Sequence, residues 1–294
     1  MLPADGRAKL KTLIGNYPHT APLKSGAVRS DRFDLEFVEI NPVWDGFKGM
    51  IRGDLYDVSE MAVVTYLIAR AHGKPLALLP AAMVGRFQHP YAIYNTTKGP
   101  MTPADLNGKR VGIRSFTTTT GAWIRGILAN DYGVDLDSID WVTFEDPHVA
   151  EFRDTTRRAP AGKAIVPMLL DGELDAVLGE SSADPRAKPL FGDPQAEALR
   201  WYAKHKVVPV NHLVVMRKSA VVADPATARE VYRLLLEGKR LAGLPADPDP
   251  VPFGIAANRA SLGLIADYAY QQKLIPRRIS VDDMFADTAE LFGA

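Results

Sequence analysis

The chain has 294 residues with 35 basic and 35 acidic side chains, so its formal net charge at pH 7 is zero and gives no overall field for nucleic acid or an anionic membrane. Hydrophobic residues make up 47%, which excludes a disordered chain, and the absence of cysteine excludes disulfides, thiolate nucleophiles and cysteine-ligated metals. No apolar run approaches the roughly 18 residues of a membrane span. The length predicts two domains.

The first third of the chain alternates short apolar runs with helical patterns. We expect strands at 10–14, 33–40, 56–58 and 76–79, and helices at 42–52 and 59–71. This order predicts a parallel sheet covered by helices, in which ligands bind beyond the carboxyl ends of the strands. Two polar segments fall at such ends, and they supply the candidates Asn16, Tyr17, His19, Ser59 and Glu60. Glu60 after Ser59 also suits the first turn of a helix, which is the structural alternative for this carboxylate.

The stretch K-R-V-G-I-R-S-F-T-T-T-T-G-A-W-I-R-G-I-L-A-N-D-Y-G (109–133) reads as a strand, a hydroxyl-rich loop and a helix that ends at Gly133. We expect the helix to start at Ala122. Its free backbone N–H groups and its dipole make a receptor for a carboxylate or phosphate. The candidate donors are Ser115, Thr117, Thr118 and Thr119. Plain capping by one hydroxyl is the alternative.

The second half repeats part of this pattern. A strand at 141–144 and a surface loop at 145–163 precede M-L-L-D-G-E-L-D-A-V-L-G-E-S (168–181), which echoes G-M-I-R-G-D-L-Y-D-V-S-E-M (49–61) and adds Glu180 and Ser181 as candidates. The later elements are helices at 193–204, 224–242 and 260–272, and a strand at 207–216 that contains Asn211 and His212. We expect crossings near His89 and His212, with one domain formed by 1–90 and 212–294 and the other by 91–211.

Several motifs in this order are similar to those of the 4,5-dihydroxyphthalate decarboxylase family. The matching pieces are G-N-Y-P-H-T (15–20), D-V-S-E-M (57–61), R-F-Q-H (86–89), P-A-D-L-N-G-K-R-V-G-I (103–113), W-I-R-G-I-L-A-N-D-Y-G-V (123–134), H-L-V-V-M-R-K (212–218) and P-F-G-I-A-A-N-R (252–259). The resemblance implies a type 2 periplasmic-binding-protein-like fold, two α/β domains with a ligand cleft between them. It also implies a decarboxylase that acts on a hydroxylated aromatic carboxylic acid.

Two loops depart from the family pattern. Arg114-Ser115-Phe116 stands where the decarboxylases usually carry Pro-Glu-Tyr, and Glu180-Ser181-Ser182 stands where they carry an Arg and prolines. Both loops are expected to face the cleft, so these changes bear on the substrate and not on the fold.

Decarboxylation of a hydroxylated ring needs an acid that protonates the carboxyl-bearing carbon, and it needs no redox cofactor. Histidine suits this role near neutral pH, and we expect His19, His89 and His212 at the cleft with Glu60 as a base or hydrogen-bond partner. A divalent metal held by these four residues is the alternative, although their spacings match no compact metal motif.

The R-F-x-H and W-x-R-x-I-L pieces supply the remaining candidates for substrate binding, which are Arg86, Phe87, Trp123 and Arg125. A planar guanidinium matches a carboxylate in a bidentate way, so Arg86 and Arg125 are the predicted clamps. A surface salt bridge is the alternative for Arg125. Trp44, Phe47 and Trp201 are expected in the core.

Two functions fit these observations. The first is a cofactor-independent decarboxylase in the cytoplasm, expected there because M-L-P-A-D-G-R-A-K-L-K has no apolar signal core. The second is a solute-binding protein that delivers an aromatic or other small carboxylate to an ABC-type transporter, because one fold can serve both functions. In either case the expected partner is a small aromatic carboxylate, with no nucleic acid and no membrane span, and a homo-oligomer is left open.

Overall fold

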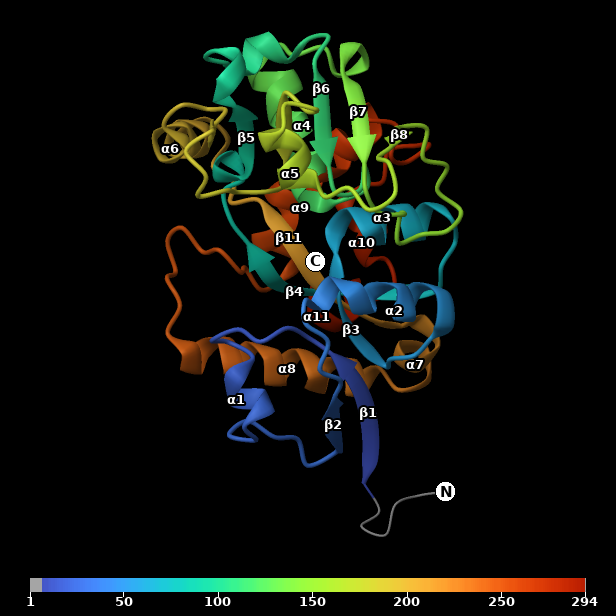
Figure 1. The fold of residues 1–294 in the computed structure, drawn as a ribbon. Helices are drawn as coiled ribbons and strands as arrows, with labels where there is room; N and C mark the ends of the chain where they lie inside the picture. Colours follow the sequence, from blue (N-terminus) through green and yellow to red (C-terminus); the bar gives the residue numbers. More distant parts are fainter. Residues whose placement is uncertain (1–6, 294) are drawn as a thin grey trace. The chain divides into compact units, whose positions relative to one another are not determined.

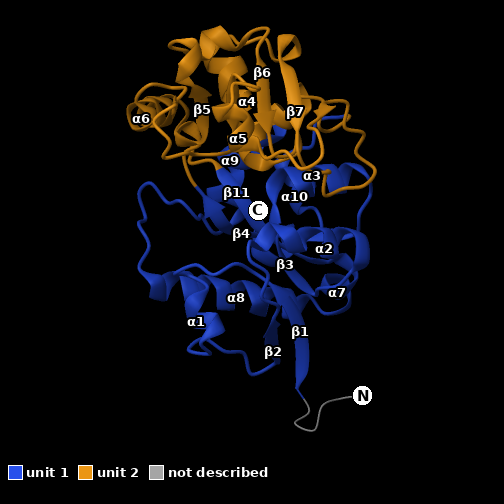
Figure 2. Cartoon of the chain, viewed as in Figure 1, with its two compact units in different colours: residues 1–85, 210–266, 277–294 blue, residues 86–209, 267–276 orange. Residues whose placement is uncertain are grey.

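The computed structural model describes residues 7–293, and these form two compact units that alternate along the chain (Figures 1 and 2). Unit 1 comprises residues up to Gly85, Val210–Ala266 and the segment from Arg277; unit 2 comprises Arg86–Pro209 and Asp267–Pro276. Each unit holds one mixed sheet with helices packed on it. Within the described residues, no helix combines the length and the apolar composition needed to cross a membrane.

The sheet of unit 1 has the strand order β2-β1-β3-β11-β4. Its strands are β1 (Ala8–Leu13), β2 (Phe33–Phe37), β3 (Val58–Ala62), β4 (Leu76–Gly85) and β11 (Val210–Arg217). The first three are parallel, and β11 runs antiparallel to both β3 and β4. Every residue of β3 is buried, as expected of a strand with a neighbour on each side.

Helices cover this sheet and close its core. They are α1 (Ala21–Lys24), α2 (Phe47–Gly53), α3 (Val63–Ala71), α7 (Lys218–Ala223), α8 (Pro225–Ala242), α10 (Val281–Phe285) and α11 (Ala289–Phe292), with a short 3-10 helix η1 (Val43–Gly46). The apolar side of α8, with Val231, Leu234 and Leu235, packs in one cluster with Val58, Val214 and Met216 of the sheet. α9 (Ile255–Gln271) contributes residues to both units.

The sheet of unit 2 has the order β10-β5-β9-β6-β7-β8. Its strands are β5 (Ala92–Asn95), β6 (Arg110–Ile113), β7 (Asp140–Thr143), β8 (Arg157–Arg158), β9 (Ala176–Leu178) and β10 (Ala187–Pro189). The strands from β9 to β8 are parallel, whereas β5 runs antiparallel to its neighbours. β6 and β9 therefore end side by side, with Ile113 paired to Leu178.

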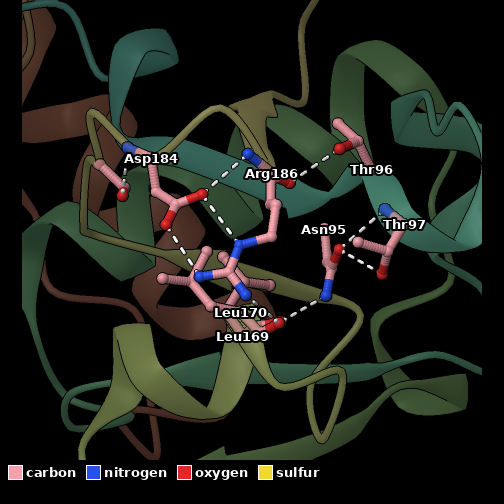
Figure 3. A network of polar contacts seen from close by, with 8 residues as sticks. Asn95, Thr96, Thr97, Leu169, Leu170, Asp184 and Arg186 are labelled. Atoms are coloured by element: carbon pink, nitrogen blue, oxygen red, sulfur yellow. Dashed lines mark hydrogen bonds and ion pairs between the residues drawn. The ribbon is translucent and has the colours of Figure 1, made fainter.

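Unit 2 contains the helices α4 (Thr119–Tyr132), α5 (Ile165–Leu170) and α6 (Pro194–His205), with 3-10 helices η2 (His89–Tyr91), η3 (Thr96–Lys98), η4 (Pro103–Leu106) and η5 (Leu136–Ser138). A polar network lies at the end of β5, beside the edge strand β10 (Figure 3). The Asn95 amide donates to the Leu169 carbonyl at 2.6 Å, and Thr96 donates to the Arg186 carbonyl at 3.0 Å. Arg186 in turn forms a bidentate pair with Asp184. These bonds satisfy backbone carbonyls at the end of α5 and just before β10.

Some predicted boundaries were wrong. Ser59 and Glu60 lie inside β3 and not in the first turn of a helix, because the backbone of β3 pairs with both β1 and β11. The central helix starts at Thr119, three residues before the expected Ala122. Trp44, expected in the core, is 37% exposed, since it lies in η1 and not on the buried side of α2.

The segment from Asp267 to Pro276 was expected with the first domain but belongs to unit 2. The ring of Tyr268 packs edge-on against Trp123 at 5.7 Å, and Gln272 is hydrogen-bonded to Arg125. The chain crosses between the units after Gly85 and after Pro209, so His89 lies in unit 2 and His212 in unit 1.

Candidate active site

In unit 1, strands β3 and β11 place Glu60 and His212 on one face of the sheet. The antiparallel register sets His212 opposite Ala62 and Val214 opposite Glu60, so the two ionisable side chains are diagonal neighbours. Further along the same face, Val58 and Met216 enter the apolar core. The Glu60–His212 pair therefore lies next to the part of this sheet face that packs into the apolar core.

The carboxyl group of Glu60 is fully buried and accepts three hydrogen bonds. Oε1 accepts from the Tyr17 hydroxyl at 2.7 Å and from Nδ1 of His212 at 2.6 Å, while Oε2 accepts from the backbone N–H of Gly15 at 2.8 Å. Burial of a carboxylate is tolerated only when its oxygens are satisfied in this way.

This arrangement fixes the orientation of the His212 ring. Because Glu60 accepts, Nδ1 of His212 is the donor and Nε2 remains for chemistry. The edge of Phe47 contacts the imidazole at a centroid distance of 5.3 Å, and the His212 side chain keeps 14% of its surface exposed. A histidine held by a carboxylate on one nitrogen and open at the other is a typical general acid–base.

His19 lies in the loop that follows β1, stacked on Tyr17 with ring centroids 5.2 Å apart. Burial lowers the pKa of His19, and this effect outweighs the nearby Glu60, which raises it. Its Nε2 is buried and has no hydrogen-bond partner in the described structure. Burial thus favours the neutral form of His19, and one polar atom of its ring is unsatisfied.

In unit 2, the predicted anion loop follows β6 and runs into α4. The hydroxyls of Ser115 and Thr117 lie 3.1 Å apart, and Thr118 donates to the Ser115 carbonyl at 3.0 Å. Thr118 occupies the N-cap position of α4 without a side-chain capping bond. That this loop receives a carboxylate stays a prediction.

Arg125 and Trp123 are both fully buried. Arg125 therefore does not form the surface salt bridge that was its alternative role. The guanidinium donates from Nε to Gln272 at 2.8 Å and from Nη2 to the Phe116 carbonyl at 2.7 Å, and it lies over the Phe116 ring. Burial lowers the pKa of Arg125 to about 9. These contacts fasten the loop after β6 to the end of α9.

His89 is buried in unit 2 among aromatic rings. Phe191 and Trp201 contact it edge-on at 4.9 and 6.2 Å, and both ring nitrogens lack a partner among the described residues. Burial lowers the pKa of His89 to about 4. The exposed Arg86 lies with its guanidinium 4.1 Å from the centre of the Tyr91 ring, and Phe87 packs on Tyr202.

The other predicted residues lie in varied settings. Glu180 follows β9 and is partly buried; burial raises its pKa, Arg114 opposes this rise and Glu145 adds to it. Ser181 is exposed, whereas Asn211 and Ser59 are buried. Asn16 is exposed and donates to Glu39 at 3.0 Å.

Sequence reasoning missed two residues that shape the sites. Gly238 lies in α8, where an added Cβ would come within 2.5 Å of the His19 carbonyl oxygen. A glycine is therefore required for α8 to approach the His19 loop, and an isolated Gly inside a strong helical pattern was the available signal. Gln272 holds Arg125 and also donates to the Ala122 carbonyl at 2.8 Å, for which no local signal exists.

The alternative metal set of three His and Glu60 is not assembled in either unit. Glu60 is satisfied by three protein donors, and His89 is enclosed by aromatic rings. Among residues 7–293, no three His, Asp or Glu side chains are grouped as metal ligands.

Solved structures with the same fold include binding proteins and an enzyme. The alkanesulfonate-binding protein SsuA from Xanthomonas axonopodis pv. citri has 16% identity and a TM-score of 0.56, covering 94% of this chain and 97% of that one. The aliphatic sulphonate-binding protein SsuA from Escherichia coli has 14% identity and a TM-score of 0.58, covering 95% and 91%. The desulfurization enzyme DSZB has 14% identity and a TM-score of 0.53, covering 95% and 96%. These likenesses confirm the predicted fold class.

Sequence comparison gives the family. No protein-family model matches the chain. The 4,5-dihydroxyphthalate decarboxylase of Comamonas testosteroni is 32% identical over 235 residues, which is 74% of this chain and 71% of the relative. The enzyme of the same name from Pseudomonas putida is 28% identical over 212 residues, covering 67% and 82%. The chain belongs to the 4,5-dihydroxyphthalate decarboxylase family, on a type 2 periplasmic-binding-protein-like fold.

Proposed function

We propose that this chain is a carboxy-lyase that decarboxylates a hydroxylated aromatic acid of the dihydroxyphthalate class. The observation that carries the proposal is the His212–Glu60 pair, with 2.6 Å between Nδ1 and Oε1, in a chain of this family. The pair supplies the proton donor that the reaction requires.

His212 in its protonated form gives the proton on Nε2 to the ring carbon that bears the carboxylate. A ring hydroxyl supports this step by pushing electron density toward that carbon. The C–C bond to the carboxylate then breaks, its electron pair restores the aromatic ring, and CO2 leaves. One proton is consumed in each turnover, and His212 regains it from water. Glu60 holds the imidazole ring of His212 in position and stabilises its protonated form.

We propose that the reaction uses no metal and no organic cofactor. This proposal is supported by the chemistry itself, in which the ring hydroxyl provides the electrons and His212 the proton. Extensive dialysis against EDTA should leave turnover unchanged. Loss of activity that is restored by a divalent cation would replace this proposal with a metal-assisted one. The cytoplasmic location stays a prediction.

The second candidate function is a solute-binding protein, favoured by the sulfonate-binding relatives in fold. The two functions separate in one experiment: the purified chain is incubated with 4,5-dihydroxyphthalate and a panel of hydroxybenzoates while CO2 release is followed. Turnover that disappears in His212→Gln supports the decarboxylase. Binding without CO2 release for every compound supports the carrier.

A further inference from the structure

Unit 2 contains a hollow that takes no part in the proposed reaction. Its volume is about 520 Å³, and it is bounded by residues around the start of β7, by the segment 152–157 and by residues 271–273. This volume lies within the roughly 300–1,000 Å³ of small-molecule sites. The hollow includes Ile139 and Asp140 at the amino end of the parallel strand β7, and it also includes Phe116 of the predicted anion loop, which follows β6.

Aromatic side chains form part of the wall. Phe116 and Trp141 lie edge to face, with centroids 5.7 Å apart, and Phe152 also lines the hollow. Rings arranged in this way offer both faces and edges to a flat aromatic ligand.

Three acidic side chains (Asp137, Asp140 and Asp154) and three basic ones (Arg153, Arg157 and Lys273) line the hollow, so the formal charges of its wall balance. Asp137 pairs with Lys273 at 3.2 Å, and Asp140 pairs with Arg157 at 3.2 Å. Asp154 accepts from the backbone N–H and the hydroxyl of Thr156. Arg153, by contrast, has no hydrogen-bond or ion-pair partner within residues 7–293, and its side chain is exposed.

A second guanidinium lies behind the same wall. Arg125 is fully buried against the rings of Phe116 and Trp141, at 3.9 and 5.6 Å from their centres, and its Nη1 has no partner. Arg125 therefore adds positive charge near the hollow, and the wall carboxylate of Asp154 favours the charged form of this guanidinium, although burial lowers its pKa more. An aromatic lining next to two guanidinium groups that keep free N–H donors, Arg153 and Arg125, matches a ligand that is both flat and anionic.

We propose that this hollow is a second binding site, specific for a small aromatic carboxylate, in which Arg153 receives the carboxylate and the aromatic wall receives the ring. The wall includes Phe116 of the anion loop and Gln272 at the end of α9, and both of these residues accept hydrogen bonds from Arg125. An occupant of the hollow thus touches the groups that fasten the loop to α9.

Equilibrium dialysis with radiolabelled benzoate tests this site without any need for turnover. Wild type should bind one more benzoate per chain than Arg153→Gln, in which affinity at the second site should fall at least about tenfold, as for loss of a charge-assisted hydrogen bond. Arg158→Gln is the matched control, because Arg158 is exposed, pairs with Asp146 and does not line the hollow. It should bind as wild type does. Arg153→Lys should restore part of the affinity.

Competition identifies the ligand class. Unlabelled benzoate should displace the label, while benzamide and inorganic phosphate should not, since the first lacks the charge and the second lacks the ring. Equal stoichiometry in Arg153→Gln and Arg158→Gln would overturn the site. Displacement by phosphate at concentrations similar to benzoate would overturn the aromatic specificity. Benzoate binding is measured without turnover. A chain that binds benzoate at Arg153 but releases no CO2 from 4,5-dihydroxyphthalate or the hydroxybenzoates would therefore refute the proposed function and leave this inference standing.

Discussion

Nδ1 of His212 lies 2.6 Å from Oε1 of Glu60, although the two residues are 152 positions apart in the sequence. The antiparallel pairing of β3 with β11 brings them together, and Tyr17 and the Gly15 N–H complete the environment of the carboxylate. Nδ1 of the imidazole is thereby fixed, and the proposed reaction assigns the proton transfer to Nε2.

Replacing His212 with Gln should abolish most turnover while binding is retained. Glutamine keeps a polar side chain of similar size but cannot carry the proton, and general acid–base groups contribute about 10²–10⁴-fold in rate. The measurement is kcat for CO2 release together with the Kd for a non-reactive analogue. His72→Gln is the control, since His72 is exposed at the end of α3 and should retain full activity. Wild-type kcat in His212→Gln would remove this residue from the reaction.

Replacing Glu60 with Gln tests the positioning of His212. The carboxylate of Glu60 accepts three hydrogen bonds through two oxygens, whereas the amide of glutamine has only one oxygen. The His212 ring therefore loses its fixed orientation and the negative partner of its charged form. We expect kcat to fall on the order of 10²–10⁴-fold with a smaller change in KM. Unfolding free energy should fall by about 1–3 kcal/mol, the cost of an unsatisfied buried group.

Tyr17→Phe provides the comparison for Glu60→Gln. It removes one donor to the carboxylate but keeps the His212 bond and the ring that stacks on His19. Its stability loss should be about 1 kcal/mol, and its kcat should stay well above that of Glu60→Gln. Equal losses of kcat in both variants would mean that Glu60 does not act through His212.

Local patterns predicted the fold class and most of the helices and strands. Apolar periodicity, and the glycines that end helices, can be recognised from neighbouring residues alone. Glu60 and His212 were recognised as candidates from their places at polar interruptions and from the family motifs. Their direct contact was not predicted, since the register of β3 against β11 depends on the whole sheet. The same limit explains why Ser59 and Glu60 were expected in a helix.

Burial was the least predictable property. His89 was expected at the cleft as a proton donor and Arg125 as a clamp for a carboxylate, yet each is enclosed by groups distant in sequence: Trp201 for His89, Gln272 for Arg125. A polar residue in an apolar motif is ambiguous between these roles until its neighbours are known.

Thr118→Val and Thr119→Val test the anion loop of unit 2. If the hydroxyls bind a carboxylate, each change should weaken affinity by roughly 1–3 kcal/mol, the value for a hydrogen bond to a charged group. The measurement is calorimetric titration with a substrate analogue. Thr227→Val is the control, because its hydroxyl only donates to Asp224 at the start of α8. Unchanged affinity in both loop variants would leave these threonines a structural role.

Arg125→Met separates a structural cation from a substrate clamp. Methionine keeps much of the volume but loses the bonds to Gln272 and to the Phe116 carbonyl. We expect the free energy of unfolding to fall by about 2–4 kcal/mol, because two acceptors in the protein interior lose a charged donor. Gln272→Leu should cause a similar loss. A large rise in KM without any loss of stability would instead support the clamp predicted from the sequence.

His89→Phe should stabilise the protein, and increasingly so at acid pH. The pKa of His89 in the folded chain is about 4, below the value of about 6.5 expected after unfolding, because burial disfavours the charged ring. The unfolded chain therefore binds more protons between these two values. The contribution of the neutral His89 ring to the free energy of unfolding is fully present above pH 6.5. It is lost as the pH falls toward 4, by up to about 3 kcal/mol. The acidic groups Glu197 and Asp131 raise the pKa and limit this loss.

Phenylalanine fits the aromatic surroundings of Phe191 and Trp201, carries no unsatisfied nitrogen and does not titrate. Urea denaturation at pH 7.5, 6.0 and 5.0 should show a stability difference between His89→Phe and wild type that grows as the pH falls. His72→Phe should follow the wild-type pH dependence, since His72 is exposed in the folded chain. A difference that is constant with pH would show that His89 does not titrate between the folded and unfolded states. The kcat of the same variant decides whether His89 has the catalytic role that the sequence predicted, because a phenyl ring cannot donate a proton.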